Sequence, residues 1–343
     1  MDRYNIDNHK LMYHPARVAS WLNHDPIVPI YIEISPTGAC NHSCSFCGLD
    51  FLNYKTHKLD PKALAKSFKI MSVLGVKSIM IAGEGEPLLH PDIAEIIMSA
   101  YKCGLDVAVT TNGSLLSLKL ARAILPYLTW LRISINGATR ATYKQIHGRD
   151  HFEDVCNNIQ AAKNLETPCT IGMQFIVLPE NEYEIEEICD LAIDLGADYL
   201  AFKPFSQHPQ MENKKYKTLV YKQEILNGIK HMKKANPNFD IIYREQAFLE
   251  CNSQAKTTSL CYAMPFWSYI DSKGDVWSCS VWIGDKRFYR GNINTDNTFD
   301  ILAKRRPDCF GFPANDCRIN CRMTRANEYL ANLQNGVIHE NFI

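Results

Sequence analysis

The run Cys40-Asn41-His42-Ser43-Cys44-Ser45-Phe46-Cys47 decides the fold of this chain, and it comes just after a strand-like stretch, Ile30-Tyr31-Ile32-Glu33-Ile34. Three cysteines at the spacing C-x3-C-x2-C can each bind one iron of a [4Fe–4S] cube, which leaves the fourth iron without a protein ligand. A small molecule can chelate such an open iron. The run therefore predicts a reactive iron–sulfur cluster at the end of the first strand.

These residues resemble the radical S-adenosylmethionine (SAM) superfamily, in which an aromatic residue, here Phe46, stands one place before the last cysteine. The resemblance implies that Cys40, Cys44 and Cys47 hold a [4Fe–4S] cluster and that the amino and carboxylate groups of SAM bind its open iron. One electron from the cluster then cleaves the sulfonium to give methionine and a 5′-deoxyadenosyl radical. A zinc site of three thiolates and His42 is the alternative, although residues only two positions apart along a tight loop, such as His42 and Cys44, rarely both point at one metal.

The composition indicates a globular protein without a general affinity for polyanions. A chain of 343 residues exceeds the usual size of one hydrophobic core, so we expect one large domain with an appendage. The 37 Lys and Arg residues balance 37 Asp and Glu residues, so no global field favours nucleic acid or a membrane surface. No stretch of about 18 apolar residues and no signal-peptide core is present. We therefore expect a cytoplasmic protein that binds neither nucleic acid nor membrane.

Thirteen cysteines in a chain of this length do not suit a secreted disulfide framework, which is typical of much smaller proteins. In a reducing compartment, closely spaced cysteines are better explained as metal ligands. Four cysteines stand alone in helix- or strand-like contexts, and we expect each of them to be a buried, unreactive thiol: Cys103, Cys156, Cys169 and Cys189.

Short apolar runs alternate with amphipathic stretches between residues 30 and 204, which predicts six βα units and a parallel sheet covered by helices. The expected strands are residues 31–35, 78–82, 106–110, 130–135, 170–177 and 199–203. The expected helices are residues 61–74, 92–103, 117–125, 139–146, 152–165 and 182–195. Parallel barrels bind ligands at the C-terminal ends of their strands, where the motifs of this chain fall. The resemblance implies an α/β fold, the partial (β/α)6 TIM barrel of the radical SAM core.

The domain organisation follows from this pattern and from the density of cysteines. Residues 1–29 are expected to form an N-terminal helical extension with a helix at 15–23, and residues 30–205 the radical SAM core. Residues 206–250 are polar, with a helix at 223–234, and are interpreted as a helical bridge. Residues 251–343 are expected to form a small C-terminal module of a β-hairpin and a helix that carries an iron–sulfur cluster.

The SAM pocket is predicted from motifs at four strand ends. Ala82-Gly83-Glu84-Gly85-Glu86-Pro87 resembles the GGEP motif of the family, whose exposed backbone groups can hydrogen-bond an ammonium and a carboxylate. Thr110-Thr111-Asn112-Gly113 matches a T-N-G motif, and the fourth strand ends in Ser134-Ile135-Asn136, where the family often has aspartate in place of Asn136. The resemblance assigns the following residues to SAM: Phe46, Gly83, Glu84, Gly85, Glu86, Thr111, Asn112, Ser134, Asn136, Arg149 and Gln174.

Lys203 ends the sixth strand and should face the mouth of the barrel. A lysine at this position can bind an anionic group of the substrate or transfer a proton. The alternative is a structural salt bridge to Glu84 or Glu33.

The C-terminal cysteines predict a second metal site. Cys261-x12-Gly274-x4-Cys279 encloses a predicted hairpin with the turn Asp271-Ser272-Lys273-Gly274, and Cys317-x3-Cys321 follows. The arrangement resembles the C-terminal modules of SPASM and twitch enzymes, which carry auxiliary [4Fe–4S] clusters. Six cysteines cannot close two such clusters, so the single-cluster twitch form fits better. The expected ligands are Cys261, Cys279, Cys317 and Cys321, while Cys251 or Cys309 replaces one of them or stands free. A zinc ribbon is the alternative.

The resemblance implies hydrogen-atom abstraction from the substrate by the adenosyl radical, fed by a flavodoxin- or ferredoxin-type reductant. A fully ligated auxiliary cluster favours oxidation of a small polar substrate such as a sugar or cyclitol. Epimerisation, with Cys251 or Cys309 as the thiol that returns a hydrogen atom, and decarboxylation are further outcomes. Lys203, Cys251 and Cys309 are thus the candidate catalytic residues. The competing hypotheses are modification of a ribosomally made peptide, for which residues 1–29 offer no separate recognition domain, and a non-enzymatic electron carrier or zinc protein.

Overall fold

Seven parallel strands follow one another across the centre of the molecule. They belong to a ten-stranded sheet with the order β11-β10-β9-β1-β2-β3-β4-β5-β6-β7. The computed structural model of the chain describes residues 3–4, 6, 8–253, 258–303, 311–313, 317, 321–338 and 341. The seven strands are β1 (Tyr31–Ile34), β2 (Ser78–Ile81), β3 (Asp106–Thr111), β4 (Trp130–Ser134), β5 (Thr170–Val177), β6 (Tyr199–Pro204) and β7 (Asp240–Tyr243).

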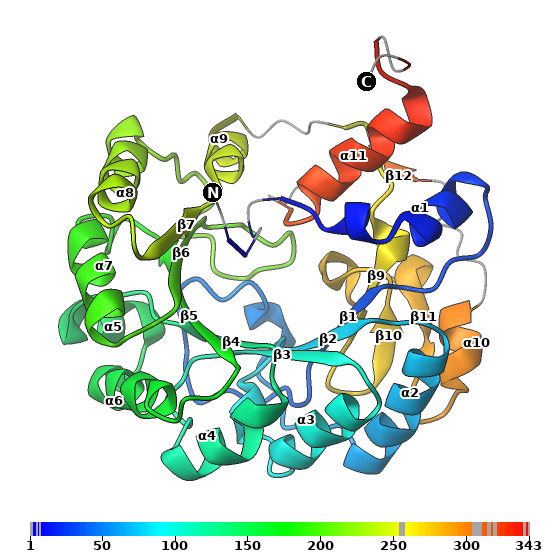
Figure 1. Ribbon diagram of the computed structural model, residues 1–343, viewed down its shortest axis with the longest axis horizontal. Helices are drawn as coiled ribbons and strands as arrows, with labels where there is room; N and C mark the ends of the chain where they lie inside the picture. Colours follow the sequence, from blue (N-terminus) through cyan, green and yellow to red (C-terminus); the bar gives the residue numbers. More distant parts are fainter. Residues whose placement is uncertain are drawn as a thin grey trace.

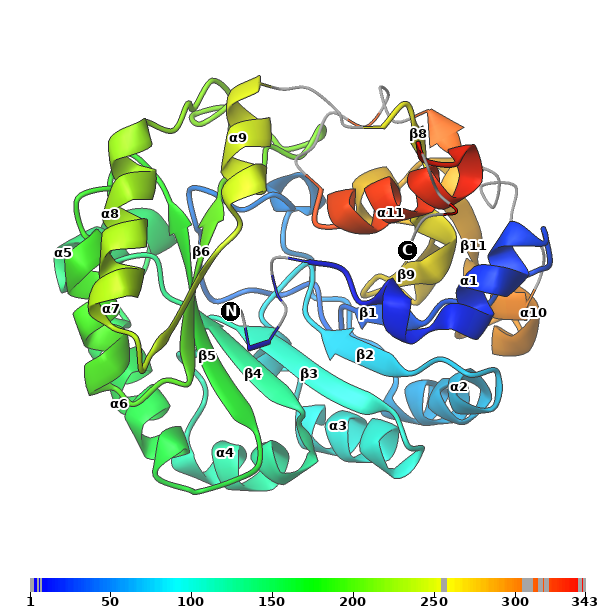
Figure 2. The ribbon, with the colours of Figure 1, turned by 45° about the horizontal axis from the view of Figure 1, so that its top comes forward.

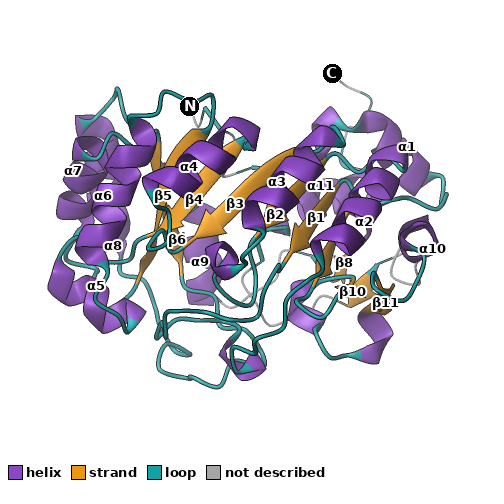
Figure 3. Cartoon of the chain, turned by 90° about the horizontal axis from the view of Figure 1, so that it is seen from below, coloured by secondary structure: helices purple, strands orange, loops and turns teal. Residues whose placement is uncertain are grey.

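Helices cover the outer, convex face of these strands, as Figures 1 and 3 show. They are α2 (Pro61–Val73), α3 (Ile93–Lys102), α4 (Leu118–Ile124), α5 (Arg140–His147), α6 (Phe152–Lys163), α7 (Ile185–Asp194) and α8 (Gln223–Ala235). Strand residues such as Ile32 and Ile34 are fully buried against the helices, whereas Tyr31 and Glu33 alternate with them and face the concave side. The predicted partial barrel is confirmed, with every predicted strand and helix within two or three residues of its expected bounds.

The C-terminal hairpin continues the sheet of the barrel. β9 (Trp267–Ile270) pairs in parallel with β1, and β10 (Asp275–Trp277) and β11 (Tyr289–Asn292) follow it in antiparallel order. The predicted turn at residues 271–274 joins β9 to β10, and Gly274 supplies the positive φ of +91° that this turn needs. At the other edge, the segment expected to be only a helical bridge contributes α8 and also β7. One sheet therefore runs through segments that the sequence pattern separates.

Among the described strands, β11 and β7 are the edges, so the barrel is open on one side. The N-terminal segment and three helices lie across this opening (Figures 1 and 2): α1 (Pro15–Leu22), α9 (Glu245–Ser253) and α11 (Thr324–Asn335). Trp21 of α1 packs with Phe266 and with Leu330 of α11 in one apolar cluster. Tyr4 and Ile6 contact interior residues of β6 and β7. These contacts fill the interior at the N-terminal ends of β6 and β7.

The smaller elements complete the description. They are α10 (Thr298–Ala303), β8 (Leu260–Cys261) and β12 (Phe312–Pro313), with single 3-10 turns at Leu11–Tyr13, Asp50–Leu52, Pro87–Leu89, Leu125–Tyr127, Met264–Phe266, Ser280–Trp282 and Lys286–Phe288. Cys169 and Cys189 are buried as predicted, whereas Cys103 and Cys156 are half-buried. None of the described helices has the length and apolar character needed to cross a bilayer.

Candidate active site

The cysteine loop, residues 40–47, is anchored on the C-terminal end of α5. The amide of Ser43 donates to the carbonyl of His147 (3.2 Å), and the amide of Ser45 donates to that of Ile146 (2.9 Å). The last carbonyls of a helix lack partners within the helix and can accept such bonds. Gly148 ends α5 at φ +68°, and a Cβ there would lie 2.3 Å from the hydroxyl of Ser43. The glycine therefore allows the loop to approach the helix end closely.

The three thiols of the cysteine loop lie close enough to interact electrostatically. Burial raises the pKa of Cys40 to about 11, and the neighbouring Glu86 and Cys47 act in the same direction. Burial also raises the pKa of Cys44 well above its usual value, with Cys47 and Cys40 adding to the effect. Three buried thiolates are costly without a compensating cation, and thiolates are the ligands of iron–sulfur clusters. The donor set thus fits a cluster.

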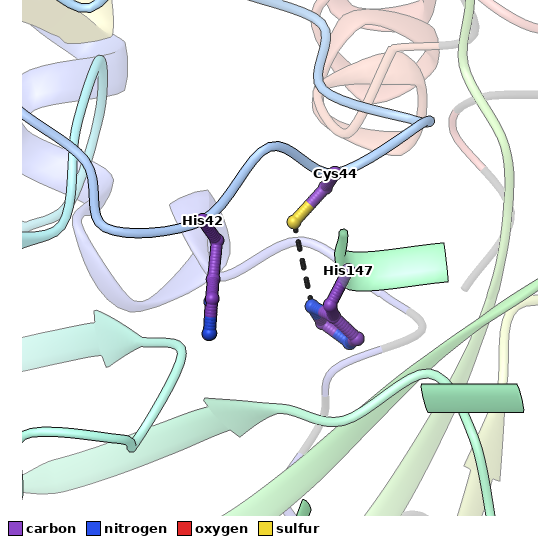
Figure 4. A group of neighbouring side chains, drawn as sticks. All are labelled: His42, Cys44 and His147. Atoms are coloured by element: carbon purple, nitrogen blue, oxygen red, sulfur yellow. Dashed lines mark hydrogen bonds between the residues drawn. The ribbon is translucent and has the colours of Figure 1, made fainter. Parts of the chain in front are cut away.

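His147, which the sequence interpretation did not single out, contacts the middle cysteine. Its Nδ1 lies 3.3 Å from the sulfur of Cys44, and its Nε2 accepts the backbone N–H of Asn136 at 3.1 Å. Figure 4 shows this bond between the cysteine loop and the end of α5. Burial lowers the pKa of His147 to about 3, so the ring is neutral near pH 7. Because Nε2 accepts, the proton of the neutral ring is on Nδ1, which donates to Cys44.

The tautomer of His147 decides whether this histidine can be a ligand if the cysteine loop binds zinc. The ligand atoms of His42, Cys44 and His147 lie within 4.8 Å of one another. A neutral imidazole has one lone pair, however, and that of His147 accepts from Asn136. His147 is thus a hydrogen-bond donor to the sulfur, not a metal ligand. His42 is 4% exposed, and neither of its ring nitrogens has a hydrogen-bond partner in the described part of the chain.

The predicted SAM motif after β2 packs directly on the cysteine loop. The amide of Glu86 donates to the carbonyl of Ala39 (2.8 Å), and a Cβ on Gly85 would lie 2.1 Å from the same oxygen. Only glycine permits this approach. The buried carboxylate of Glu86 accepts from the hydroxyl of Thr111 (2.5 Å) and the amide of Asn112 (2.7 Å). Glu86 therefore joins the ends of β2 and β3 beside the cluster loop.

The remaining residues assigned to SAM have different environments. Asn112 donates to Asn41 of the cysteine loop at 2.8 Å. Ser134 and Gln174 are register partners on β4 and β5. The side-chain oxygen of Asn136 accepts a hydrogen bond from the amide of Ile176. The ring of Phe46 meets the ring of His147 edge to face. Gly83 has a positive φ of +109°. Glu84 accepts from the amide and hydroxyl of Ser272 in the hairpin turn, and Arg149 is exposed near His42.

The four predicted auxiliary ligands line one pocket, which is partly open to solvent: Cys261, Cys279, Cys317 and Cys321. Burial raises the pKa of Cys261 to about 12, and Cys321 and Cys317 raise it further. The same causes raise the pKa of Cys279. Trp267, Trp282 and Phe312 enclose the thiols. Of the two spare cysteines, Cys251 on α9 donates to the carbonyl of Phe205 at 3.3 Å, and Cys309 lies outside the described residues.

Lys203 is half-buried at the C-terminal end of β6. Burial lowers the pKa of Lys203 well below its usual value, and the guanidinium groups of Arg132, Arg244 and Arg322 lower it further. The carboxylate of Glu33 is bound by Arg322, and that of Glu84 by Ser272. Neither predicted salt bridge to Lys203 is thus present in the described part of the structure.

A family model described as the radical SAM superfamily matches residues 34–192. GTP 3′,8-cyclase of Chlorobaculum tepidum is 32% identical over 184 residues, 52% of this chain and 55% of that protein. A probable GTP 3′,8-cyclase of Methanothermobacter marburgensis is 33% identical over 174 residues, 49% of this chain and 55% of that protein. The chain thus spans about half the length of these curated relatives.

Two groups of solved structures share the fold. SuiB of Streptococcus suis, in a structure bound to the precursor peptide SuiA, superposes with a TM-score of 0.68 over 86% of this chain and 69% of that chain, at 16% identity. Native anSMEcpe with bound AdoMet superposes with a TM-score of 0.65 over 88% of this chain and 89% of that chain, at 18% identity. Residues 34–192 therefore form a radical SAM domain, the kind of domain whose cofactors are a [4Fe–4S] cluster and SAM.

Proposed function

We propose that this enzyme oxidises a small polar substrate, such as a sugar, cyclitol or related metabolite, by two electrons. The observation that carries the proposal is the presence of two separate cysteine sets: three thiols in the loop after β1, and four thiols that line one cavity in the C-terminal segment. When bound, the first cluster and SAM supply the adenosyl radical that removes a hydrogen atom, and a second, fully ligated cluster supplies an acceptor for one electron.

The residues of the chain have three tasks in this proposal. Cys40, Cys44 and Cys47 hold the SAM-binding cluster, with Cys44 receiving the hydrogen bond of His147. The loop Gly85-Glu86-Pro87 (the GEP loop), which packs against Ala39 through Gly85, orients SAM at the edge of the barrel. Ser134 and Gln174, side by side on the concave face, lie where they can bind the ribose.

Substrate enters from the C-terminal ends of the strands in this proposal. The opposite end of the interior holds Tyr4 and Ile6 against Tyr199, Ala201 and Ile242, so this side excludes water from the reacting atoms. A flavodoxin- or ferredoxin-type protein is the proposed reductant.

Oxidation is favoured over epimerisation by the environment of Cys251. Its thiol donates to a backbone carbonyl, and the residue packs against the main hydrophobic core. A thiol that returns a hydrogen atom to the substrate must face the interior instead. GTP, on which the curated relatives are named to act, is a candidate substrate for assay; the match to those proteins covers about half of their length.

The test uses anaerobically reconstituted protein with SAM and dithionite. We expect about eight iron atoms per chain for two clusters and formation of 5′-deoxyadenosine. Cys44→Ala should abolish 5′-deoxyadenosine formation. Cys279→Ala should lower the iron content by about four atoms while SAM cleavage continues. Zinc in place of iron, no released nucleoside, or loss of all iron from Cys279→Ala would contradict the proposal.

A further inference from the structure

The concave face of the sheet has an unbalanced group of cationic side chains. On β6, Leu200 and Phe202 pack among the helices, whereas Tyr199 and Ala201 face the interior, so the alternation places Lys203 on the interior side. On β4, Leu131 and Ile133 face the helices and Arg132 faces the interior. Two basic side chains thus project from β4 and β6 toward the interior of the barrel.

Arg132 is held in place by uncharged groups. Its Nε donates to the hydroxyl of Tyr199 at 3.0 Å, and its guanidinium lies 4.8 Å from the ring centroid of Trp130 and 5.7 Å from that of Tyr199. Gly172 makes this possible, because a Cβ there would lie 2.0 Å from the Tyr199 ring. No salt bridge between described residues includes Arg132. These contacts fix the guanidinium without neutralising its charge.

Two further arginines reach the same space from the open side of the barrel. Arg322, just before α11, pairs with Glu33 of β1 and lies 4.6 Å from the ring centroid of Trp267. Its side chain keeps 38% of its surface exposed. Arg244, just after β7, donates from Nη2 to the carbonyl of Arg322 at 3.1 Å.

The charges that act on Lys203 show that these groups form one electrostatic environment. After burial, the largest influences on the lysine are Arg132, Arg244 and Arg322, and Glu33 is the one carboxylate among them. Arg322 is paired with Glu33, whereas no salt bridge between described residues includes Arg132 or Lys203, so these two side chains add positive charge to the ion pair. Like charges gathered in a partly buried space destabilise the protein unless a ligand compensates them.

We propose that these basic side chains, Arg132, Lys203, Arg244 and Arg322, bind a phosphate or carboxylate group of the substrate. The inference rests on the proposed function for the presence of a substrate in the barrel. It narrows the substrate class from small polar molecules to anionic ones. Guanidinium groups bind both oxyanions in a bidentate manner, and the lysine adds a point charge.

The test is isothermal titration calorimetry of the reconstituted holoenzyme with SAM present and no reductant. The probes are inorganic phosphate, pyrophosphate and malonate, which separate phosphate from carboxylate recognition. We expect one saturable site per chain, and affinity about tenfold lower in Lys203→Met and in Arg132→Met. Arg132→Lys should recover part of the loss. Lys69→Met and Arg122→Met, exposed on α2 and α4, are matched controls that should bind as the wild type does.

Several results would overturn the proposal. They are no saturable binding of any probe, equal affinity in the wild type and both interior variants, or binding that occurs only in a parallel titration without SAM, which would assign these basic side chains to SAM. Circular dichroism of each variant checks that it is folded. The wild-type assay for 5′-deoxyadenosine is independent of these titrations: a holoenzyme that binds pyrophosphate but never forms the nucleoside refutes the proposed function and not the anion site.

Discussion

Replacing Gly85 by alanine tests whether the GEP loop positions the cysteine loop. The backbone at Gly85 has no positive φ, so alanine brings no conformational strain and acts only through the volume of its methyl group. That methyl group would lie 2.1 Å from the carbonyl oxygen of Ala39, 2.7 Å from its carbonyl carbon and 2.8 Å from the carbonyl carbon of Gly38. All three are backbone atoms, so no side chain can rotate to relieve the overlap.

The size of the effect follows from these distances. The gap of 2.1 Å is about 1.3 Å short of the 3.4 Å at which ordinary contact begins, so the two loops must separate by about that much. The hydrogen bond from Glu86 to Ala39, now 2.8 Å, would then lengthen beyond hydrogen-bonding distance. A lost hydrogen bond and the overpacking together cost about 2–4 kcal/mol of folding free energy. Ala39 precedes Cys40, so the first thiol moves with it.

The assay compares Gly85→Ala with Gly228→Ala, anaerobically purified and reconstituted side by side. Gly228 lies in α8, where an added methyl group comes no closer than 4.0 Å to Ile185, so alanine should stabilise the helix by about 0.5–1 kcal/mol. We expect Gly85→Ala to have a lower unfolding temperature, less iron bound at the first site and little 5′-deoxyadenosine formation. Unchanged iron content, nucleoside yield and unfolding temperature in Gly85→Ala would refute the close packing of the two loops.

Three other predictions follow from single contacts. The variant His147→Leu removes the hydrogen bond to Cys44 and should lower the reduction potential of the SAM-binding cluster by roughly 50 mV, because this bond stabilises the reduced, more negative state. The potential is measured by EPR-monitored redox titration, with His151→Leu as the control. Equal potentials in the wild type and His147→Leu would contradict the assignment. The pKa of Lys203 is lowered in the folded protein, so its positive charge reduces the free energy of unfolding. This loss of stability is largest below the folded-state pKa and disappears as the pH approaches the unfolded-state pKa of about 10.4. Lys203→Met should therefore raise the unfolding temperature of the ligand-free protein more at pH 6 than at pH 10, and a lower unfolding temperature at pH 6 would oppose this. Glu84→Gln weakens the bond to the hairpin turn and should cost about 1–2 kcal/mol in chemical unfolding, while no change would show that the turn does not depend on the charge.

Local pattern was sufficient for the order and type of the elements in the radical SAM core. The strands from Tyr31–Ile34 to Tyr199–Pro204 lie where apolar runs end at glycine or polar motifs, because strand and helix periodicity is a property of neighbouring residues. The spacing of Cys40, Cys44 and Cys47 likewise indicated the cofactor, because three thiols on one short loop necessarily lie near each other.

Pairings between distant segments required the tertiary structure. The parallel pairing of β9 with β1 joins residues far apart in the sequence, so no local pattern indicates it. The short edge strand β7 has no local pattern either, because a four-residue strand resembles any short apolar run. The sequence did not single out His147, which reaches Cys44 because the end of α5 turns its imidazole inward. Arg322 meets Glu33 across 289 positions of the chain. These two charges meet only because the chain folds, and their separation along the sequence gives no indication of the contact.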